Sequence, residues 1–281
     1  MIPAAFDYVA PTSVQEALAV LAQAGDDAKV LGGGQSLLPI LRMRLNAPET
    51  VVDLGRIDAL RGISEDGDAL VIGAMTTYAE VLASDLVRDH ALLLHKAVAT
   101  IADPQIRHRG TVGGALVHAD PAGDVGAPVL ALGGELVIAG SGGERRVAAA
   151  DFFEDLFTTA VGDDELLVAV RIPKHTGWGA AYEKFVRVAQ QWSIVAVAAT
   201  VRAEGGTITQ ARIGLTNMGS TPLRATAVED ALVGKGAGDL AAICASAGAG
   251  TNPPSDLNGD ADYRRHLAGV LTRRAVAAAL G

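Results

Sequence analysis

Apolar residues recur at two spacings along the chain, and these spacings predict an alternation of helices and strands. Residues 14–24 carry apolar side chains at the i, i+3, i+4 spacing of a helix. Ser13 is placed to cap its start and Gly25 to end it. Short apolar runs at residues 28–31 and 49–54 predict strands. The chain therefore begins as a mixture of helices and strands.

The same alternation continues to the middle of the chain. Residues 61–73 predict a hairpin, because two apolar runs flank the turn signal Asp66-Gly67. Pro173 ends the last predicted strand of this part. Further helices are predicted at residues 78–83, 91–101 and 125–132, and further strands at residues 135–139, 145–148 and 166–172.

The pattern changes near residues 174–177, where we place a domain boundary. This gives one domain of residues 1–176, with subdomains 1–57 and 58–176, and a second of residues 177–281. Long alternating runs at residues 179–188, 193–203 and 207–216 predict a three-stranded antiparallel sheet, and helices at residues 224–233, 239–247 and 262–280 are expected to cover one face of it. The predicted fold class is α/β (α+β).

Two short segments are rich in glycine, and both are typical of phosphate-binding loops. The first is residues 32–36 (GGGQS), and the second is residues 111–115 (TVGGA). A glycine lets the backbone turn sharply and lets consecutive N–H groups approach an anion closely. The pair predicts a diphosphate held from two sides, whereas ordinary tight turns are the alternative for either segment alone. A side chain at Gly33 or Gly114 should then weaken binding more than folding.

Other nucleotide-binding motifs are excluded by their spacing. A Rossmann fingerprint needs a glycine at the sixth position from Gly32, where Leu37 stands. A P-loop needs serine or threonine after Gly-Lys, but Gly234-Lys235 is followed by Gly236. The sequence therefore gives no support for nucleoside-triphosphate chemistry.

The flanks of the glycine segments resemble the FAD-binding medium subunit of molybdenum hydroxylases, the group of aerobic carbon monoxide dehydrogenase and xanthine dehydrogenase. The similar stretches are residues 31–41 (LGGGQSLLPIL), 101–124 (IADPQIRHRGTVGGALVHADPAGD) and 213–224 (IGLTNMGSTPLR), in the family's order. The resemblance implies a two-part FAD-binding domain of the PCMH/vanillyl-alcohol-oxidase type, followed by a small C-terminal flavoprotein domain. It also implies that both glycine segments hold the diphosphate of FAD.

The resemblance implies the role of an electron-transfer subunit, most similar to that of carbon monoxide dehydrogenase. A large partner subunit would carry molybdenum and molybdopterin and hydroxylate the substrate, and a small partner would carry [2Fe-2S] clusters. Noncovalent FAD on this chain would pass electrons to an external acceptor, in a dimer of heterotrimers. A stand-alone flavin oxidoreductase and a flavin-free scaffold subunit remain alternatives.

The resemblance also assigns roles to individual side chains. Asp124 would contact the ribose or adenine of FAD, Lys184 would lie near the flavin ring, and Trp192 would lie beside it. Arg107 would form a structural ion pair or neutralise the diphosphate. The alternatives are a helix cap for Asp124, a solvated loop cation for Arg107, an outer-face strand lysine for Lys184 and a core or interface tryptophan for Trp192. The implied cofactor-binding residues are Leu31, Gly32, Gly33, Gly34, Gln35, Ser36, Leu37, Ile101, Thr111, Gly113, Gly114, Ala115, Asp120, Asp124, Leu167, Lys184 and Trp192.

One departure from the family pattern falls in the second glycine segment. Family sequences usually continue Gly-Gly with asparagine, and Ala115 stands there. The side-chain amide is lost, while the backbone N–H of Ala115 is expected to remain a donor. Weaker FAD binding is the expected consequence.

Composition narrows the remaining possibilities. With 32 acidic and 23 basic side chains, the net charge of −9 disfavours nucleic-acid and anionic-membrane partners. The single cysteine, Cys244, excludes an intrachain disulfide and an iron–sulfur cluster held by this chain alone. His118, Asp120 and Asp124 are of metal-ligand type, but no second histidine has ligand spacing, so we assign no metal site. We see neither a secretory signal nor a membrane span and expect a cytoplasmic location.

Overall fold

The structure, a computed structural model, describes residues 2–281 and begins with a small parallel sheet. Its elements are β1 (Asp7–Val9), α1 (Val14–Ala24), β2 (Ala28–Leu31), α2 (Leu37–Met43) and β3 (Thr50–Asp53). The strand order is β1-β3-β2, and β3 pairs in parallel with both neighbours. Helix α1 begins and ends as predicted, because the Ser13 hydroxyl accepts the Glu16 N–H and Gly25 adopts φ +57°.

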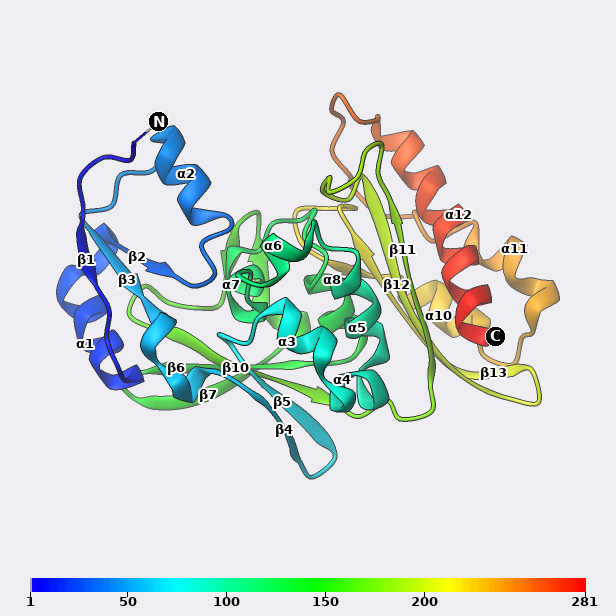
Figure 1. The fold of residues 1–281 in the computed structure, drawn as a ribbon. Helices are drawn as coiled ribbons and strands as arrows, with labels where there is room; N and C mark the ends of the chain where they lie inside the picture. The colour runs from blue at the N-terminus through cyan, green and yellow to red at the C-terminus, as the bar shows by residue number, and fades with distance from the viewer. Residues whose placement is uncertain (1) are drawn as a thin grey trace.

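A five-stranded antiparallel sheet forms the centre of the molecule, in the order β4-β5-β10-β6-β7 (Figure 1). Its strands are β4 (Ile63–Asp66), β5 (Ala69–Gly73), β6 (Glu135–Gly140), β7 (Gly143–Ala148) and β10 (Leu166–Pro173). The β4–β5 hairpin is confirmed, but Asp66 pairs with Ala69. The turn therefore lies at Gly67-Asp68, one residue later than predicted.

Short helices cover the central sheet, and one of them, α7, carries the second glycine segment. They are α3 (Tyr78–Ala83), α4 (Asp85–His90), α5 (Leu92–Ala99), α6 (Pro104–Arg107), α7 (Val112–His118), α8 (Gly126–Ala131) and α9 (Ala149–Phe152), and a small hairpin of β8 (Phe153–Asp155) and β9 (Thr158–Thr159) comes after them. Helix α4 was not predicted. The Ser84 hydroxyl caps it by accepting the Val87 N–H, so the chain starts a new helix there.

The C-terminal sheet has four strands rather than the predicted three, in the order β11-β12-β13-β14. Its strands are β11 (Gly179–Phe185), β12 (Val195–Glu204), β13 (Thr207–Thr216) and β14 (Leu223–Arg224), and its helices are α10 (Thr226–Leu232), α11 (Leu240–Cys244) and α12 (Ala261–Leu280). The added strand β14 pairs only Leu223 and Arg224 with β13. It is too short to show alternation in the sequence.

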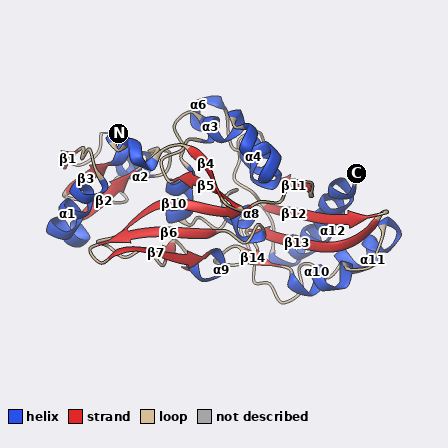
Figure 2. Cartoon of the chain, turned by 90° about the horizontal axis from the view of Figure 1, so that it is seen from below, coloured by secondary structure: helices blue, strands red, loops and turns tan. Residues whose placement is uncertain are grey.

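Both faces of the C-terminal sheet are buried, and this joins the two halves of the molecule (Figure 2). On one face Val195 and Val197 pack in the cluster beneath α12. On the other, Ala196, Ala198 and Tyr182 belong to the same core as α5 and α8. The prediction that C-terminal helices cover one face is correct, and helices of the preceding half cover the other. None of the helices within residues 2–281 combines the length and apolar character needed to cross a membrane.

Candidate functional site

The structure places the two glycine segments side by side. A Cβ built on Gly32 would lie 3.8 Å from the Cα of Gly114, and one built on Gly114 would lie 3.9 Å from the nitrogen of Gly33. The first segment links β2 to α2, and the second is carried by the start of α7. The segments are about eighty residues apart in the sequence, so their contact supports a shared site.

The first segment has four consecutive backbone N–H groups without a partner. Among residues 2–281, no backbone or side-chain acceptor takes a hydrogen bond from the amides of Gly33, Gly34, Gln35 or Ser36. Gly34 is buried and adopts φ +77°, a conformation that favours glycine. A run of consecutive unpaired N–H donors, one of them at the buried Gly34, is suited to an anionic ligand.

The second segment differs from the prediction, because its glycines lie in the first turn of α7 rather than in a loop. Thr111 is the N-cap and its hydroxyl accepts the Gly114 N–H at 3.2 Å. The Gly113 N–H donates to the Ala74 carbonyl at 2.8 Å, and the Ala115 N–H donates to the Thr111 carbonyl at 3.1 Å. These three amides are therefore already bonded, and the expectation that the Ala115 N–H stays available is wrong.

The space around each glycine corrects the expectation that a side chain at Gly33 would weaken binding more than folding. A Cβ on Gly33 would lie 2.1 Å from the Arg109 carbonyl oxygen, so a side chain there would disrupt the fold itself. A Cβ on Gly113 would lie 2.5 Å from the Cβ of Ala74. A Cβ on Gly114 would meet only the Thr111 hydroxyl at close range, 2.7 Å away, and Gly114 is exposed. Of these three glycines, only Gly114 could carry a side chain that obstructs the cofactor without disrupting the fold.

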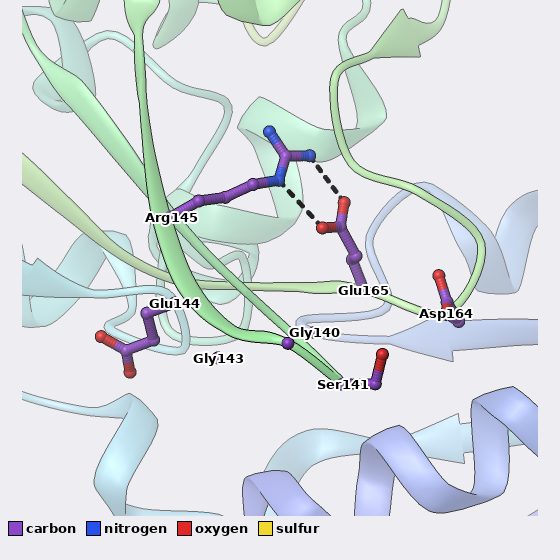
Figure 3. Close-up of a pocket in the computed structure, with 8 residues that line it drawn as sticks. Gly140, Ser141, Gly143, Glu144, Arg145, Asp164 and Glu165 are labelled. Atoms are coloured by element: carbon purple, nitrogen blue, oxygen red, sulfur yellow. Dashed lines mark hydrogen bonds and ion pairs between the residues drawn. The ribbon is translucent and has the colours of Figure 1, made fainter.

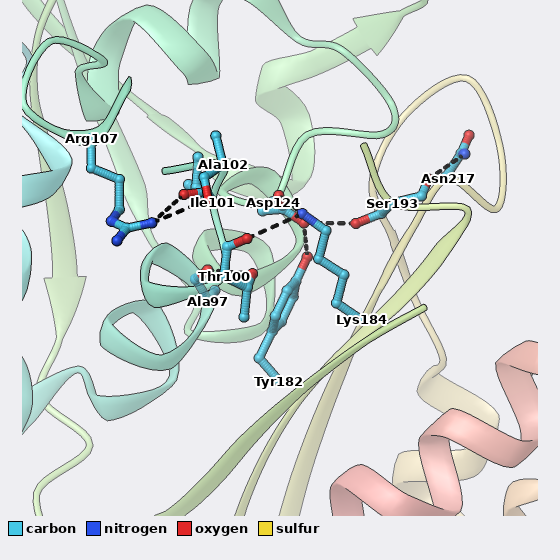
Figure 4. Close-up of polar contacts among 10 residues, drawn as sticks. All are labelled: Ala97, Thr100, Ile101, Ala102, Arg107, Asp124, Tyr182, Lys184, Ser193 and Asn217. Atoms are coloured by element: carbon cyan, nitrogen blue, oxygen red, sulfur yellow. Dashed lines mark hydrogen bonds and ion pairs between the residues drawn. The ribbon is translucent and has the colours of Figure 1, made fainter. Parts of the chain in front are cut away.

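Asp124 forms a buried polar cluster between the two halves of the molecule (Figure 4). Its Oδ1 accepts hydrogen bonds from the hydroxyls of Tyr182 and Ser193, both at 2.7 Å. Its Oδ2 pairs with the Lys184 ammonium at 2.7 Å, and the two side chains are 4% and 9% exposed. Burial raises the pKa of Tyr182 well above its usual value, and the Asp124 charge raises it further. Tyr182 is therefore a permanent donor to this carboxylate.

Cations of both halves hold the turn after α5. Lys184 contacts the Thr100 carbonyl at 3.4 Å, and Arg107 donates to the Ile101 carbonyl at 2.6 Å and more weakly to that of Ala102. Arg107 thus bonds carbonyls rather than forming an ion pair. Next to this turn lies a pocket of about 390 Å³, lined by Thr100, Tyr182, Glu183, Lys184, Val186, Ala189, Gln190 and Gln191. The turn and the pocket bring Ile101 and Lys184, two of the predicted residues, into one neighbourhood.

Other predicted residues lie in varied surroundings. Trp192 is 54% exposed, so it is not a core tryptophan. Leu167 is buried in β10 within the central core. The Asp120 carboxylate accepts the Ala122 N–H at 2.9 Å and stabilises a turn. Gln35 donates its side-chain amide to the Gly33 carbonyl at 3.2 Å, and this contact fixes the shape of the first segment.

Three residues of the polar cluster were not predicted. Tyr182 precedes Lys184 by two positions in β11, so the period-2 pattern of a strand already places both on one face. Asn217 has φ +62° and donates its side-chain amide to the Ser193 and Ile194 carbonyls, at 2.8 and 3.2 Å. Neither the partners of Ser193 nor those of Asn217 could be read from the sequence, because they lie in distant segments.

A second pocket, of about 210 Å³, lies at the tip of the β6–β7 hairpin and contains no predicted site residue (Figure 3). Arg145 and Glu165 form a two-pronged ion pair there, with distances of 2.9 and 2.7 Å. The hydrogen bonds from Arg145 lower the pKa of Glu165. In the part of the chain that the structure describes, no three His, Cys, Asp or Glu side chains gather as metal ligands would.

Comparison with known proteins gives matches along nearly the whole chain. Residues 4–175 match the family model described as the FAD binding domain in molybdopterin dehydrogenase, and residues 180–279 match that of the CO dehydrogenase flavoprotein C-terminal domain. The carbon monoxide dehydrogenase medium chain of Hydrogenophaga pseudoflava is 42% identical, with 99% of this chain and 98% of that protein covered. The medium chain of the same name from Afipia carboxidovorans is 44% identical, with 98% and 97% covered.

A solved structure agrees with these matches. The structure of carbon monoxide dehydrogenase from Hydrogenophaga pseudoflava lacking the Mo-pyranopterin moiety of its molybdenum cofactor superimposes with a TM-score of 0.96. The aligned sequences are 44% identical, and the match covers 99% of this chain and 98% of that one. The fold predicted from the resemblance, an FAD-binding domain followed by a C-terminal flavoprotein domain, is confirmed.

Proposed function

We propose that this chain, which belongs to the family of FAD-binding subunits of molybdopterin dehydrogenases, is the electron-transfer flavoprotein of a molybdenum hydroxylase complex. The observation that carries the proposal is the run of unpaired amides at residues 33–36, beside Gly114, in a chain that matches this family at full length. Four N–H donors in sequence suit the oxygens of a diphosphate. The residues present therefore fit FAD.

The two glycine segments divide the work in this proposal. The amides of Gly33, Gly34, Gln35 and Ser36 bind the phosphate oxygens directly. Gly113 and Gly114 contribute no free donor, and the missing Cβ of Gly114 leaves room beside those amides. The loss of the family asparagine at Ala115 then affects neither the phosphate-binding amides nor the space beside Gly114, so we expect tight FAD binding despite this substitution.

The pocket beside Lys184 is where we place the flavin ring. FAD, when bound, accepts electrons singly or in pairs. Lys184 puts a positive charge on the pocket wall, and such a charge favours a ring that gains negative charge. Both oxygens of Asp124 are bonded within the chain, so we propose that Asp124 holds Lys184 in place rather than contacting the ribose.

Partner subunits supply the rest of the reaction in this proposal. The relatives are medium chains of carbon monoxide dehydrogenase, so we propose a complex of that type, with a large molybdenum subunit and a small [2Fe-2S] subunit as a dimer of heterotrimers. With a single cysteine, Cys244, this chain cannot itself hold a typical cluster. Electrons would pass from the partner's clusters to FAD here and then to an external acceptor.

Two measurements on the purified full chain test the proposal. Visible absorption should show bound flavin, and acid precipitation should release it into the supernatant, since neither glycine segment contains a cysteine or histidine for attachment. A colourless chain that binds no added FAD would instead support the flavin-free scaffold. Flavin that precipitates with the protein would contradict noncovalent binding.

The partner requirement is tested by dye reduction. The chain alone should reduce no dye when supplied with carbon monoxide, aldehydes or purines, whereas the complex copurified from its source should reduce dye with one of them. Substrate oxidation by the single chain would contradict the electron-transfer role and support a stand-alone flavoenzyme.

A further inference from the structure

One wall of the pocket beside Lys184 is a loop, residues 186–193, which follows β11 and leads through Ile194 to β12, and residues 187–190 of it are exposed. Val186, Ala189, Gln190 and Gln191 of this loop line the pocket. The ends of the loop are tied together, because the Ile194 N–H donates to the Phe185 carbonyl at 3.0 Å. Ala189 and Gln190 are themselves exposed, so the apolar core does not fix the loop's middle.

Gln191 determines the shape of the loop and connects it to a distant turn. Its side-chain oxygen accepts the N–H groups of Arg187 and Val188, at 3.0 and 3.4 Å. Its side-chain nitrogen donates to Asn258 Oδ1 at 3.1 Å. The Asn258 N–H in turn donates to Asp256 Oδ1 at 2.7 Å. The pocket loop is thus bonded to the turn that precedes α12.

Arg264 of α12 contacts both ends of this arrangement. It is completely buried. Its Nη2 pairs with Asp256 Oδ1 at 2.7 Å, its Nη1 donates to the Ile194 carbonyl, and its Nε contacts the Gly259 carbonyl at 3.4 Å. A planar guanidinium has donors in fixed directions, so it can hold two segments in one relative position.

We propose that Arg264 is a positioning residue for the flavin pocket and acts as a bracket that fixes the 186–193 loop at two places. It holds the base of the loop through Ile194. It holds the middle of the loop through Asp256, Asn258 and Gln191. This inference rests on the proposed function for the identity of the pocket's ligand. Arg264 lines no part of the pocket. Its effect on the cofactor is therefore transmitted through the loop.

The test combines two variants that interrupt the bracket at different points with a matched control for each. Arg264→Met removes the bracket. Asn258→Ala removes only its connection to Gln191 and leaves the buried arginine in place. Arg265→Met is the first control, because Arg265 contacts Asp262 and the Thr251 carbonyl, away from the loop. Asn252→Ala is the second, since the Asn252 side chain forms no hydrogen bond within residues 2–281.

The first readout is amide hydrogen exchange of the full chain freed of flavin. The exchange of Arg187 and Val188 should accelerate on the order of tenfold or more in Arg264→Met and Asn258→Ala, and should be unchanged in both controls. If Arg264→Met does not fold, Asn258→Ala alone decides. If Arg187 and Val188 exchange at the parent's rate in the folded bracket variants, the proposed role of Arg264 is contradicted, whether or not the chain binds FAD.

The second readout is the flavin itself. In the holoprotein, iodide should quench the fluorescence of bound flavin more strongly in the bracket variants than in the controls, because a loosened pocket wall admits solvent. Arg264→Lys should keep only part of the parent's protection against quenching, since lysine cannot bridge Ile194 and Asp256. Accelerated exchange with unchanged quenching would overturn the link to the pocket. If the parent chain binds no FAD, the proposed function is contradicted. The exchange rates of Arg187 and Val188 then still test whether Arg264 fixes the loop.

Discussion

The two glycine segments have similar sequences but different structures. The segment of residues 32–36 keeps four backbone donors unpaired, whereas Gly113 and Gly114 have their N–H groups bonded to Ala74 and Thr111. The two bonds of the second segment have different origins: the Gly113 N–H reaches a carbonyl of a neighbouring segment, and the Gly114 N–H reaches the cap of its own helix. Thr111 caps α7 with its hydroxyl, while Ser36 forms no capping hydrogen bond at the start of α2. Glycine pairs therefore indicate a close approach, whereas the acceptors around each amide in the folded chain decide whether the amide is free.

The largest expected effect comes from Gly33→Ala, which should disrupt the packing of the first segment against residues 109–110, just before the second segment. Its Cβ would lie 2.1 Å from the Arg109 carbonyl oxygen, and backbone must move to relieve this overlap. Such overpacking costs about 1–3 kcal/mol or more, which for a chain of this size lowers the melting temperature by roughly 2–12 °C. Thermal melting of the flavin-free chain measures this, and a melting temperature equal to the parent's would show that the segments do not touch as described.

Gly114→Ala should separate binding from folding. The new Cβ would lie 2.7 Å from the Thr111 hydroxyl, so this cap must shift, at a cost of up to about 0.5–2 kcal/mol. Alanine gains about 1 kcal/mol of helix propensity in α7 and offsets this cost, so stability should stay within about 1 kcal/mol of the parent. The added Cβ should push the phosphate away from one of the neighbouring free amides of residues 33–36, so FAD affinity should fall about tenfold to a hundredfold, since one charge-assisted hydrogen bond is worth about 1.5–3 kcal/mol.

The control for Gly114→Ala is Gly142→Ala, where no atom lies within 4 Å of the added Cβ. FAD titration of the flavin-free chains compares the two. Equal affinities for both variants would mean that Gly114 gives no room to the cofactor.

A pair of substitutions compares the two capping positions. Thr111→Val removes the hydroxyl that accepts the Gly114 N–H and should cost about 0.5–2 kcal/mol of stability. Ser36→Ala removes no capping bond and should change stability by less than about 0.5 kcal/mol, while weakening FAD binding if the hydroxyl joins the free amides. Chemical denaturation measures both, and equal losses of stability would contradict the difference between the segments.

The smallest expected effect is on the pH dependence of the free energy of unfolding. It comes from His118, the last residue of α7, the helix that carries the second segment. Burial lowers the pKa of His118, although the nearby Asp120 charge opposes this. The unfolded chain therefore binds more protons than the folded one just below pH 6.5, so the free energy of unfolding should decline as the pH falls through this range. His118→Gln should reduce the decline, and an unchanged pH profile in that variant would exclude His118 as a source.

The sequence predicted the fold well where local signals decide it. Caps and periodicity located α1, and the turn signal at Asp66-Gly67 located the β4–β5 hairpin to within one residue. The short strands β1 and β14 have too few residues to show alternation. Helix α4 depends on the Ser84 cap between α3 and α4, in a stretch where no helix was predicted.

The candidate site was predicted in part, for a different reason. The glycine segments and Lys184 follow from motifs and from the resemblance. That Asp124 bonds Tyr182, Ser193 and Lys184 depends on packing between segments about sixty residues apart, which no local pattern encodes. Whether an amide is free likewise depends on its partners in the folded chain.

The most direct measurement is residue-resolved amide hydrogen exchange of the full chain with and without FAD. The account predicts that FAD slows exchange at Gly33, Gly34, Gln35 and Ser36 by about tenfold or more, because bound phosphate replaces water as their acceptor. Exchange at Gly113 and Gly114 should change little, since both amides are bonded without the cofactor. Protection confined to the second segment, or none at residues 33–36 in an FAD-saturated chain, would contradict the central claim.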